Sequence, residues 1–108
     1  MTSAELLATL AAIGHTQRLR IIAELAGGRV HVSELARRLG LSRPLLYMHL
    51  ERLEKAGIVS GELELSEDGK AMKFFELTDF ELTITVDTIR AALAADQGDG
   101  NDNSEVET

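Results

Sequence analysis

The sequence contains no cysteine, and its 108 residues include only one proline. The absence of cysteine excludes disulfide bonds, thiolate metal sites and cysteine-based redox sensing. No apolar run approaches the roughly 20 residues needed to cross a bilayer. The first residues, MTSAELLATLAAIG, have no positively charged start and carry Glu5, so we expect a folded helix there and not a signal peptide. The expected location is therefore the cytoplasm.

The sequence also lacks the residue patterns of an enzyme or a metal centre. Its three histidines, His15, His31 and His49, follow no spacing typical of metal ligands. It has no nucleophile motif and no glycine-rich loop that would bind phosphate groups. We therefore expect no catalytic residue, no bound metal and no cofactor.

Acidic residues outnumber basic ones, and the net charge is −7. Residues 1–57 nevertheless carry a net charge of +3, whereas residues 58–90 and 91–108 each carry −5. Binding to a polyanion follows the local field more than the total charge. The first half of the chain is thus the part suited to nucleic acid, and the overall acidity predicts modest affinity with a marked dependence on salt.

The most informative stretch is SELARRLGLSRPLLYMHLERLEKAG, residues 33–57. Ser33 is expected to cap a short helix that Gly40 ends, and Ser42 to cap a second helix with Pro44 in its first turn. Apolar residues recur at helical spacing in the second helix until Gly57. Two helices joined by a tight turn with glycine are typical of a helix-turn-helix, whose second helix enters the major groove of DNA.

The flanking segments extend this motif to a complete domain. Apolar periodicity predicts helices over 3–13, 16–26 and 86–95, the last one capped by Thr85. Residues 58–65 and 72–77 are expected to form strands joined at Asp68-Gly69, a strong hairpin signal; we call this hairpin the wing, with its tip at about 66–72. Residues 30–32 are expected to form a short extended piece before the helix at Ser33. The predicted fold is α+β, mainly helical with a small hairpin, in the order helix, helix, short strand, helix, helix, hairpin, helix: a winged helix-turn-helix domain over residues 1–95. Residues 96–108 are polar and acidic, and we expect a disordered tail.

With this element order, the chain resembles the ArsR-type winged-helix transcriptional repressors. The resemblance rests on TQRLRI at 16–21, SELA at 33–36, LS at 41–42 and HLERLEKAGIV at 49–59. It implies a homodimer that places two recognition helices in successive major grooves of a pseudo-palindromic operator. It also implies release of DNA when an effector binds, often a metal held by cysteines or by residues of the last helix. This chain has no cysteine and no histidine in that helix, so both kinds of metal site are absent from the sequence.

Within this resemblance, the recognition helix covers about 43–56. Arg43 is suited to a guanine edge, Tyr47 to a phosphate or base, and Met48 or Leu45 to a thymine methyl. His49 has two alternatives, a DNA contact or a bond within the fold. The residues expected to bind DNA are Thr16, Ser33, Arg38, Ser42, Arg43, Pro44, Tyr47, Met48, His49, Arg52, Lys70 and Lys73.

The first and last helices carry apolar stripes that this small domain has little surface to cover. We expect them to form the dimer interface, through Leu6, Leu10, Ile13, Val86, Ile89 and Leu93. The sequence does not identify the effector. The alternatives are a small molecule, a partner protein, pH, salt, or no effector at all. It also leaves an alternative function, that of a winged-helix protein-interaction module with little DNA binding of its own, which the net acidity and the apolar Leu45 and Met48 favour.

Overall fold

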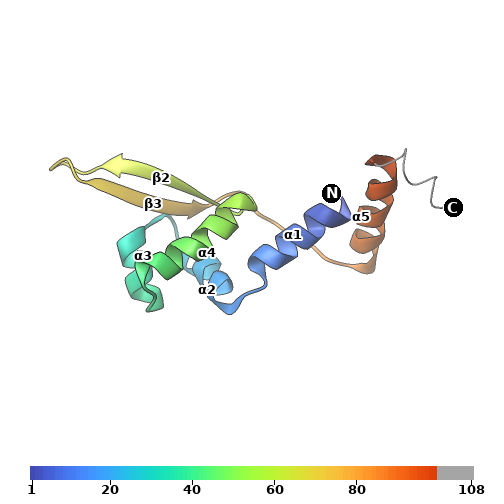
Figure 1. The fold of residues 1–108 in the computed structure, drawn as a ribbon, viewed down its shortest axis with the longest axis horizontal. Coiled ribbons are helices and arrows are strands. Elements are labelled where there is room, and N and C mark those ends of the chain that lie inside the picture. The colour runs from blue at the N-terminus through green and yellow to red at the C-terminus, as the bar shows by residue number, and fades with distance from the viewer. Residues whose placement is uncertain (100–108) are drawn as a thin grey trace. The chain divides into compact units, whose positions relative to one another are not determined.

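A computed structural model describes residues 1–99, and the helices and strands follow the predicted order (Figure 1). The helices are α1 (Ser3–Ile13), α2 (Thr16–Leu25), α3 (Val32–Leu39), α4 (Arg43–Lys55) and α5 (Val86–Asp99). The strands are β1 (Val30–His31), β2 (Val59–Leu65) and β3 (Ala71–Leu77). The expected α+β winged helix-turn-helix fold is therefore confirmed. Among these helices none is both long and apolar enough to span a membrane.

The chain divides into two compact units. One unit comprises residues 12–80, which include α2, α3, α4 and the three strands. The other is formed by residues 1–11 together with the chain from Glu81 onwards, and it holds most of α1 and all of α5. The predicted DNA-reading elements thus lie in the first unit and most of the predicted dimer stripe lies in the second.

Turn chemistry explains where α3 and α4 end. Gly40 adopts a left-handed φ of 68° after α3, and the amide of Leu41 then donates to the carbonyl of Ala36 at 3.0 Å. Gly57 ends α4 in the same way, with a φ of 78°. A left-handed glycine strains the backbone less than any other residue would. Both ends fall where the sequence predicts them.

One hydrophobic core holds α2, α3, α4 and the sheet together. Its fully buried members include Ile21 from α2, Leu35 from α3 and Leu46, Leu50 and Leu53 from α4. Val59 and Phe75 extend the core onto β2 and β3. Burial of one such side chain contributes about 1.5–3 kcal/mol, so this core fixes the orientation of α4 against the wing.

The three strands form an antiparallel sheet in the order β1-β3-β2. In the β2–β3 register Gly61 lies opposite Phe75 and Leu63 opposite Lys73. The hairpin turns at Gly69, whose φ is 84°, and the amide of Ser66 donates to the carbonyl of Lys70 at 2.8 Å. The Asp68-Gly69 turn is confirmed, and Figure 1 shows the wing extending past α3 and α4.

Two helix ends differ from the sequence expectation. Helix α3 begins at Val32 with His31 as its N-cap, so Ser33 lies inside the first turn and is not the capping residue. Pairing of Val30 and His31 with β3 keeps these two residues extended, and the helix starts directly after them. Helix α5 continues to Asp99 rather than ending near Ala95.

Asp96 gives the physical reason for the longer α5. Its carboxylate accepts hydrogen bonds from the Ser3 amide at 2.8 Å and from the Ser3 hydroxyl at 2.5 Å. These bonds tie the end of α5 to the start of α1 and lower the pKa of Asp96. Residues 96–99 therefore belong to a helix and not to a disordered tail, and residues 100–108 of the predicted tail lie outside the described residues.

Candidate nucleic-acid interface

Helix α4 has an exposed face opposite its buried side, and this face carries both polar and apolar side chains. Leu46, Leu50 and Leu53 are fully buried against the core. The exposed positions are those that the sequence singles out on this helix and its cap, namely Ser42, Arg43, Pro44, Leu45, Tyr47, Met48 and Arg52. The predicted recognition face is thus solvent-accessible along three turns of the helix.

The start of α4 is well defined by hydrogen bonds. The Ser42 hydroxyl accepts from the amide of Leu45 at 3.3 Å, as expected for an N-cap. The Arg43 guanidinium donates to the hydroxyl of Ser33, which lies in the first turn of α3. Two of the predicted DNA-binding residues from different helices are therefore in direct contact, and the contact sets the direction of the Arg43 side chain.

His49 does not share this exposed face. It is 2% exposed, and its Nδ1 accepts a hydrogen bond from Nε of Arg18 at 3.1 Å. Of the two roles left open for His49, the structure shows the bond within the fold. Burial, followed by the positive charges of neighbouring groups, lowers the pKa of His49. A neutral ring is required here, because Nδ1 accepts the Arg18 hydrogen bond only when it carries no proton.

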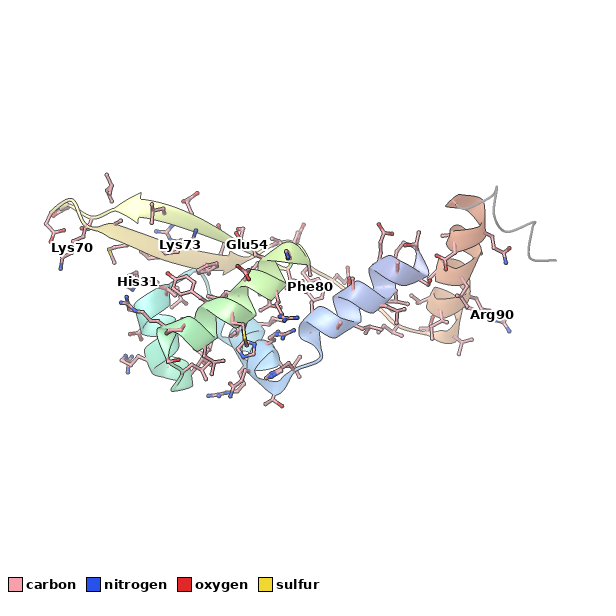
Figure 2. All side chains as sticks on the ribbon, in the orientation of Figure 1. His31, Glu54, Lys70, Lys73, Phe80 and Arg90 are labelled. Carbon is pink, nitrogen blue, oxygen red and sulfur yellow. The ribbon has the colours of Figure 1, made fainter. Side chains whose placement is uncertain are left out.

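Tyr47 connects α4 to the wing. Its ring meets that of Phe75 edge to face, with 6.4 Å between the ring centroids. The ammonium group of Lys73 lies 5.6 Å from the centroid of the same Phe75 ring. Figure 2 shows Lys70 at the tip of the wing and Lys73 farther along β3. Both lysines predicted to bind DNA are therefore on the wing, and Lys73 is the one near α4.

The predicted DNA-binding residues on α2 and α3 differ in whether their side chains are free to contact DNA. Thr16 is the first residue of α2 and is exposed. Arg38 is exposed as well, but it pairs with Glu34 at 2.9 Å and with Glu24 at 3.4 Å. Arg37 also pairs with Glu34, and the two guanidinium groups lower the pKa of that carboxylate to about 2. These ion pairs reduce the positive field that α3 offers to DNA.

The basic residues of α4 and the wing lack such acidic partners. Within residues 1–99, no ion pair involves Arg43, Arg52, Lys70 or Lys73. An unpaired surface cation keeps its full attraction for a phosphate group. The cations of the candidate site that are free of acidic partners therefore lie on α4 and the wing.

Sequence reasoning missed the part played by Arg18 and His15. Arg18 is 8% exposed, and besides binding His49 it donates through Nη1 to the carbonyl of Ala12 at 3.1 Å. His15 caps α2, since its Nδ1 accepts from the amide of Gln17 at 3.1 Å, and its ring lies 4.6 Å from that of His49. The helical spacing of Arg18 on the buried side of α2, beside Ile21 and Leu25, is the signal that could have revealed it.

The predicted dimer residues fall into two groups. On α5, Val86, Ile89 and Leu93 are all exposed. On α1, Leu6 is only 5% exposed and is therefore already covered within one chain, while Leu10 and Ile13 are half-buried. The three α5 residues are the part of the predicted stripe that is free to meet a partner. No group of three metal-ligating side chains occurs anywhere in the described part of the chain.

Comparison with known proteins places this geometry among transcriptional regulators. Residues 15–60 match the family described as "Bacterial regulatory protein, arsR family". An uncharacterized HTH-type transcriptional regulator from Methanocaldococcus jannaschii is 33% identical over 79 residues, which cover 73% of this chain and 82% of that protein.

Solved structures give the same fold. HlyU from Vibrio cholerae is 30% identical and superposes with a TM-score of 0.59, over 71% of this chain and 78% of that one. NolR from Sinorhizobium fredii is 21% identical, with a TM-score of 0.61 over 91% of this chain and 86% of that one. At that identity NolR supports the fold alone.

Proposed function

Because this chain belongs to the ArsR family of helix-turn-helix transcriptional regulators, and is therefore not an enzyme, we propose that it is a homodimeric, sequence-specific repressor. In this proposal α4 enters the major groove of a pseudo-palindromic operator in the cytoplasm, and the wing lies at the backbone or minor groove. The observation that carries the proposal is the exposed face of α4, whose cations are free of acidic partners.

Individual side chains suit separate roles in such a complex. Arg43 stands at the start of α4, where recognition helices contact base edges, and its planar guanidinium matches O6 and N7 of guanine. Tyr47 and Met48 follow one turn later on the same exposed surface. Arg52, Lys70 and Lys73 provide positive charge for the phosphates. Thr16 and Ser33, each in the first turn of a helix, offer hydroxyl groups to the backbone.

Two of the predicted DNA contacts, those of His49 and Arg38, are treated differently from the others because both side chains have partners within the protein. Because His49 is buried and bonded to Arg18, we leave it out of the contacting set. Arg38 remains in the set, but its pairs with Glu34 and Glu24 must open before it meets a phosphate. An exposed ion pair of this kind contributes less than about 1 kcal/mol, so DNA can compete with it.

The α5 surface supports dimerisation. Val86, Ile89 and Leu93 leave an apolar stripe in water, and a second copy of the chain would cover it. Two recognition helices held at a fixed distance would read two half-sites at once. Linked binding of this kind raises the affinity well above that of one half-site.

The proposal is tested by selecting duplexes from a random pool and measuring binding by fluorescence anisotropy. We expect Arg43→Ala and Tyr47→Ala each to lower the affinity for the selected duplex about tenfold, in line with the loss of one base contact. Leu19→Ala, on the exposed side of α2, serves as the control and should bind normally. Unchanged affinity in both α4 variants would remove this face from the site. Failure to select any duplex, with stable co-purification of another protein, would instead favour the protein-interaction module.

A further inference from the structure

The two faces of the wing carry different chemistry. Strand residues alternate between faces, so the β2–β3 register places Leu63, Leu65 and Lys73 on the same face as the buried ring of Phe75. We call this the leucine face. Leu65 is 74% exposed, more than any other large apolar side chain among residues 1–99, and Leu63 is 63% exposed. These two largely exposed leucines lie next to each other and beside Lys73, so they form an apolar surface on the two-stranded ribbon.

The opposite face of the wing is acidic and already occupied. Glu62, Glu64 and Glu76 project from it. Arg29 binds Glu64 through two hydrogen bonds of 2.5 and 2.8 Å, and its guanidinium lies 4.0 Å from the centroid of the Phe74 ring. One arginine against three carboxylates leaves this face negative, so it would repel a nucleic acid.

Acidic groups weaken the positive charge at the tip of the wing. It carries Glu67 and Asp68 beside Lys70. Asp68 is held in the turn, because its Oδ1 accepts from the Ser66 hydroxyl and from the amide of Lys70. A wing that approaches DNA therefore approaches with the leucine face and not with its tip.

The leucine face is continuous with the exposed surface of α4. Tyr47 of α4 contacts Phe75, and the ammonium group of Lys73 lies over the same Phe75 ring. Gly61 provides the space for this arrangement. A Cβ at position 61 would lie 2.7 Å from Cε1 of Phe75 and 2.8 Å from Cε of Lys73. These contacts link the recognition helix to Lys73, which lies opposite Leu63 in the strand register.

We propose that the wing lies in the minor groove of A·T base pairs with Leu63 and Leu65 as apolar contacts, while Lys73 and Lys70 meet the flanking phosphates. This inference rests on the proposed DNA-binding function and specifies how its wing reads DNA. The minor groove of an A·T pair lacks the guanine amino group, so its floor accepts an aliphatic side chain. Leucine is among the residues that architectural proteins place against minor-groove base steps, where it bends the duplex.

The first experiment compares the duplexes that two full-length proteins select from a random pool. The wild-type protein is expected to enrich A·T pairs outside the half-sites read by α4. The double variant Leu63→Thr/Leu65→Thr is expected to select the same half-sites without this enrichment. Threonine favours strands, which keeps the hairpin folded, and circular dichroism checks this. Leu19→Thr is the control, on an exposed leucine of α2.

The second experiment changes the DNA and leaves the protein intact. Replacing the selected A·T pairs by G·C should weaken wild-type binding about tenfold, and inosine·C, which lacks the amino group, should restore it. The double leucine variant should be insensitive to both changes. Its affinity should fall equally at every salt concentration, because no phosphate contact is lost, whereas Lys73→Ala should reduce the salt slope by about 1.

The outcomes separate this inference from the function on which it rests. Selection of half-sites with no A·T preference, or a leucine variant that binds and selects as the wild type does, overturns the minor-groove contact alone. The exposed leucines would then serve a protein partner. Failure of the wild-type protein to select any duplex overturns the DNA-binding function and this inference together.

Discussion

Nε of Arg18 donates a hydrogen bond to Nδ1 of His49 over 3.1 Å, and both side chains are buried. The same guanidinium donates through Nη1 to the carbonyl of Ala12, in the last turn of α1. Arg18 therefore joins the end of α1 to the middle of α4.

Replacement of Arg18 by methionine should destabilise the protein by about 2–4 kcal/mol. Methionine keeps much of the side-chain volume but leaves the acceptors of His49 and Ala12 buried without this donor, and each such loss costs roughly 1–3 kcal/mol. Urea unfolding followed by circular dichroism measures the change. Arg37→Met, at an exposed position of α3, is the control and should stay within about 0.5 kcal/mol of the wild type. A loss below about 1 kcal/mol in the Arg18 variant would contradict the structural role.

Stability should fall as the pH drops below about 6.5, in part because of His49. The pKa of His49 is lowered in the folded protein, chiefly by burial, so the unfolded chain binds the proton first as the pH falls. The free energy of unfolding then decreases from the ordinary histidine pKa downwards, until the lowered pKa is reached. His49→Gln retains an acceptor for Arg18 without titrating in this range. Unfolding curves at several pH values should therefore slope less in this variant, and parallel slopes would refute the assignment.

Local patterns in the sequence were sufficient to predict the fold because each element carries its own signals. Ser42 caps α4, Gly40 and Gly57 end α3 and α4, and Asp68-Gly69 makes the wing turn, all within a few residues of the chain. The start of α3 was missed because pairing of His31 with Phe74, more than forty residues away, overrides the capping preference of Ser33. The end of α5 was missed for the same reason, since Asp96 is held by Ser3.

The candidate site was predictable only in part. Helical periodicity identified the exposed face of α4, but it did not decide between two roles for His49, whose partner Arg18 is 31 residues away. Which cations are free also depends on contacts between elements. Arg29 and Arg38 are paired with acids of other elements, and this pairing cannot be read from local charge counts. The exposed leucine face of the wing requires the strand register as well as the alternation.

Glu34→Gln should increase affinity for DNA and steepen its salt dependence. Glu34 neutralises Arg37 and Arg38, and the variant would free Arg37 and leave Arg38 paired with Glu24 alone, adding between about 1 and 2 to the salt slope. Anisotropy titrations at several salt concentrations measure the slope. Glu51→Gln removes one negative charge without breaking a pair of Arg37 or Arg38, and it is the control. Equal slopes for Glu34→Gln and the wild type would show that the two arginines do not reach DNA.

The ion pairs of Glu34 also lead to a prediction for its titration at acidic pH. Hydrogen bonds from Arg37 and Arg38 hold the pKa of Glu34 at about 2, below its usual value of 4.5. The carboxylate therefore stays charged at pH 3 to 4, and its contribution to stability is lost only as the pH falls from 4.5 through about 2. Carbon-detected NMR titration reads this pKa directly. A midpoint near 4.5 would mean that the pairs do not persist in solution.

Leu93→Asp should convert the proposed dimer to a monomer. Leu93 is exposed on α5 beside Ile89, and a partner chain covering this stripe would bury the introduced carboxylate, which is costly without a compensating charge. Loss of the second half-site should then lower affinity for the selected duplex about 100-fold, the range expected when linked binding is lost. Light scattering gives the mass, and Leu19→Asp places the same charge on an exposed leucine outside the stripe. A variant that remains dimeric and binds normally would exclude the α5 stripe from the interface, and the two chains would have to meet elsewhere.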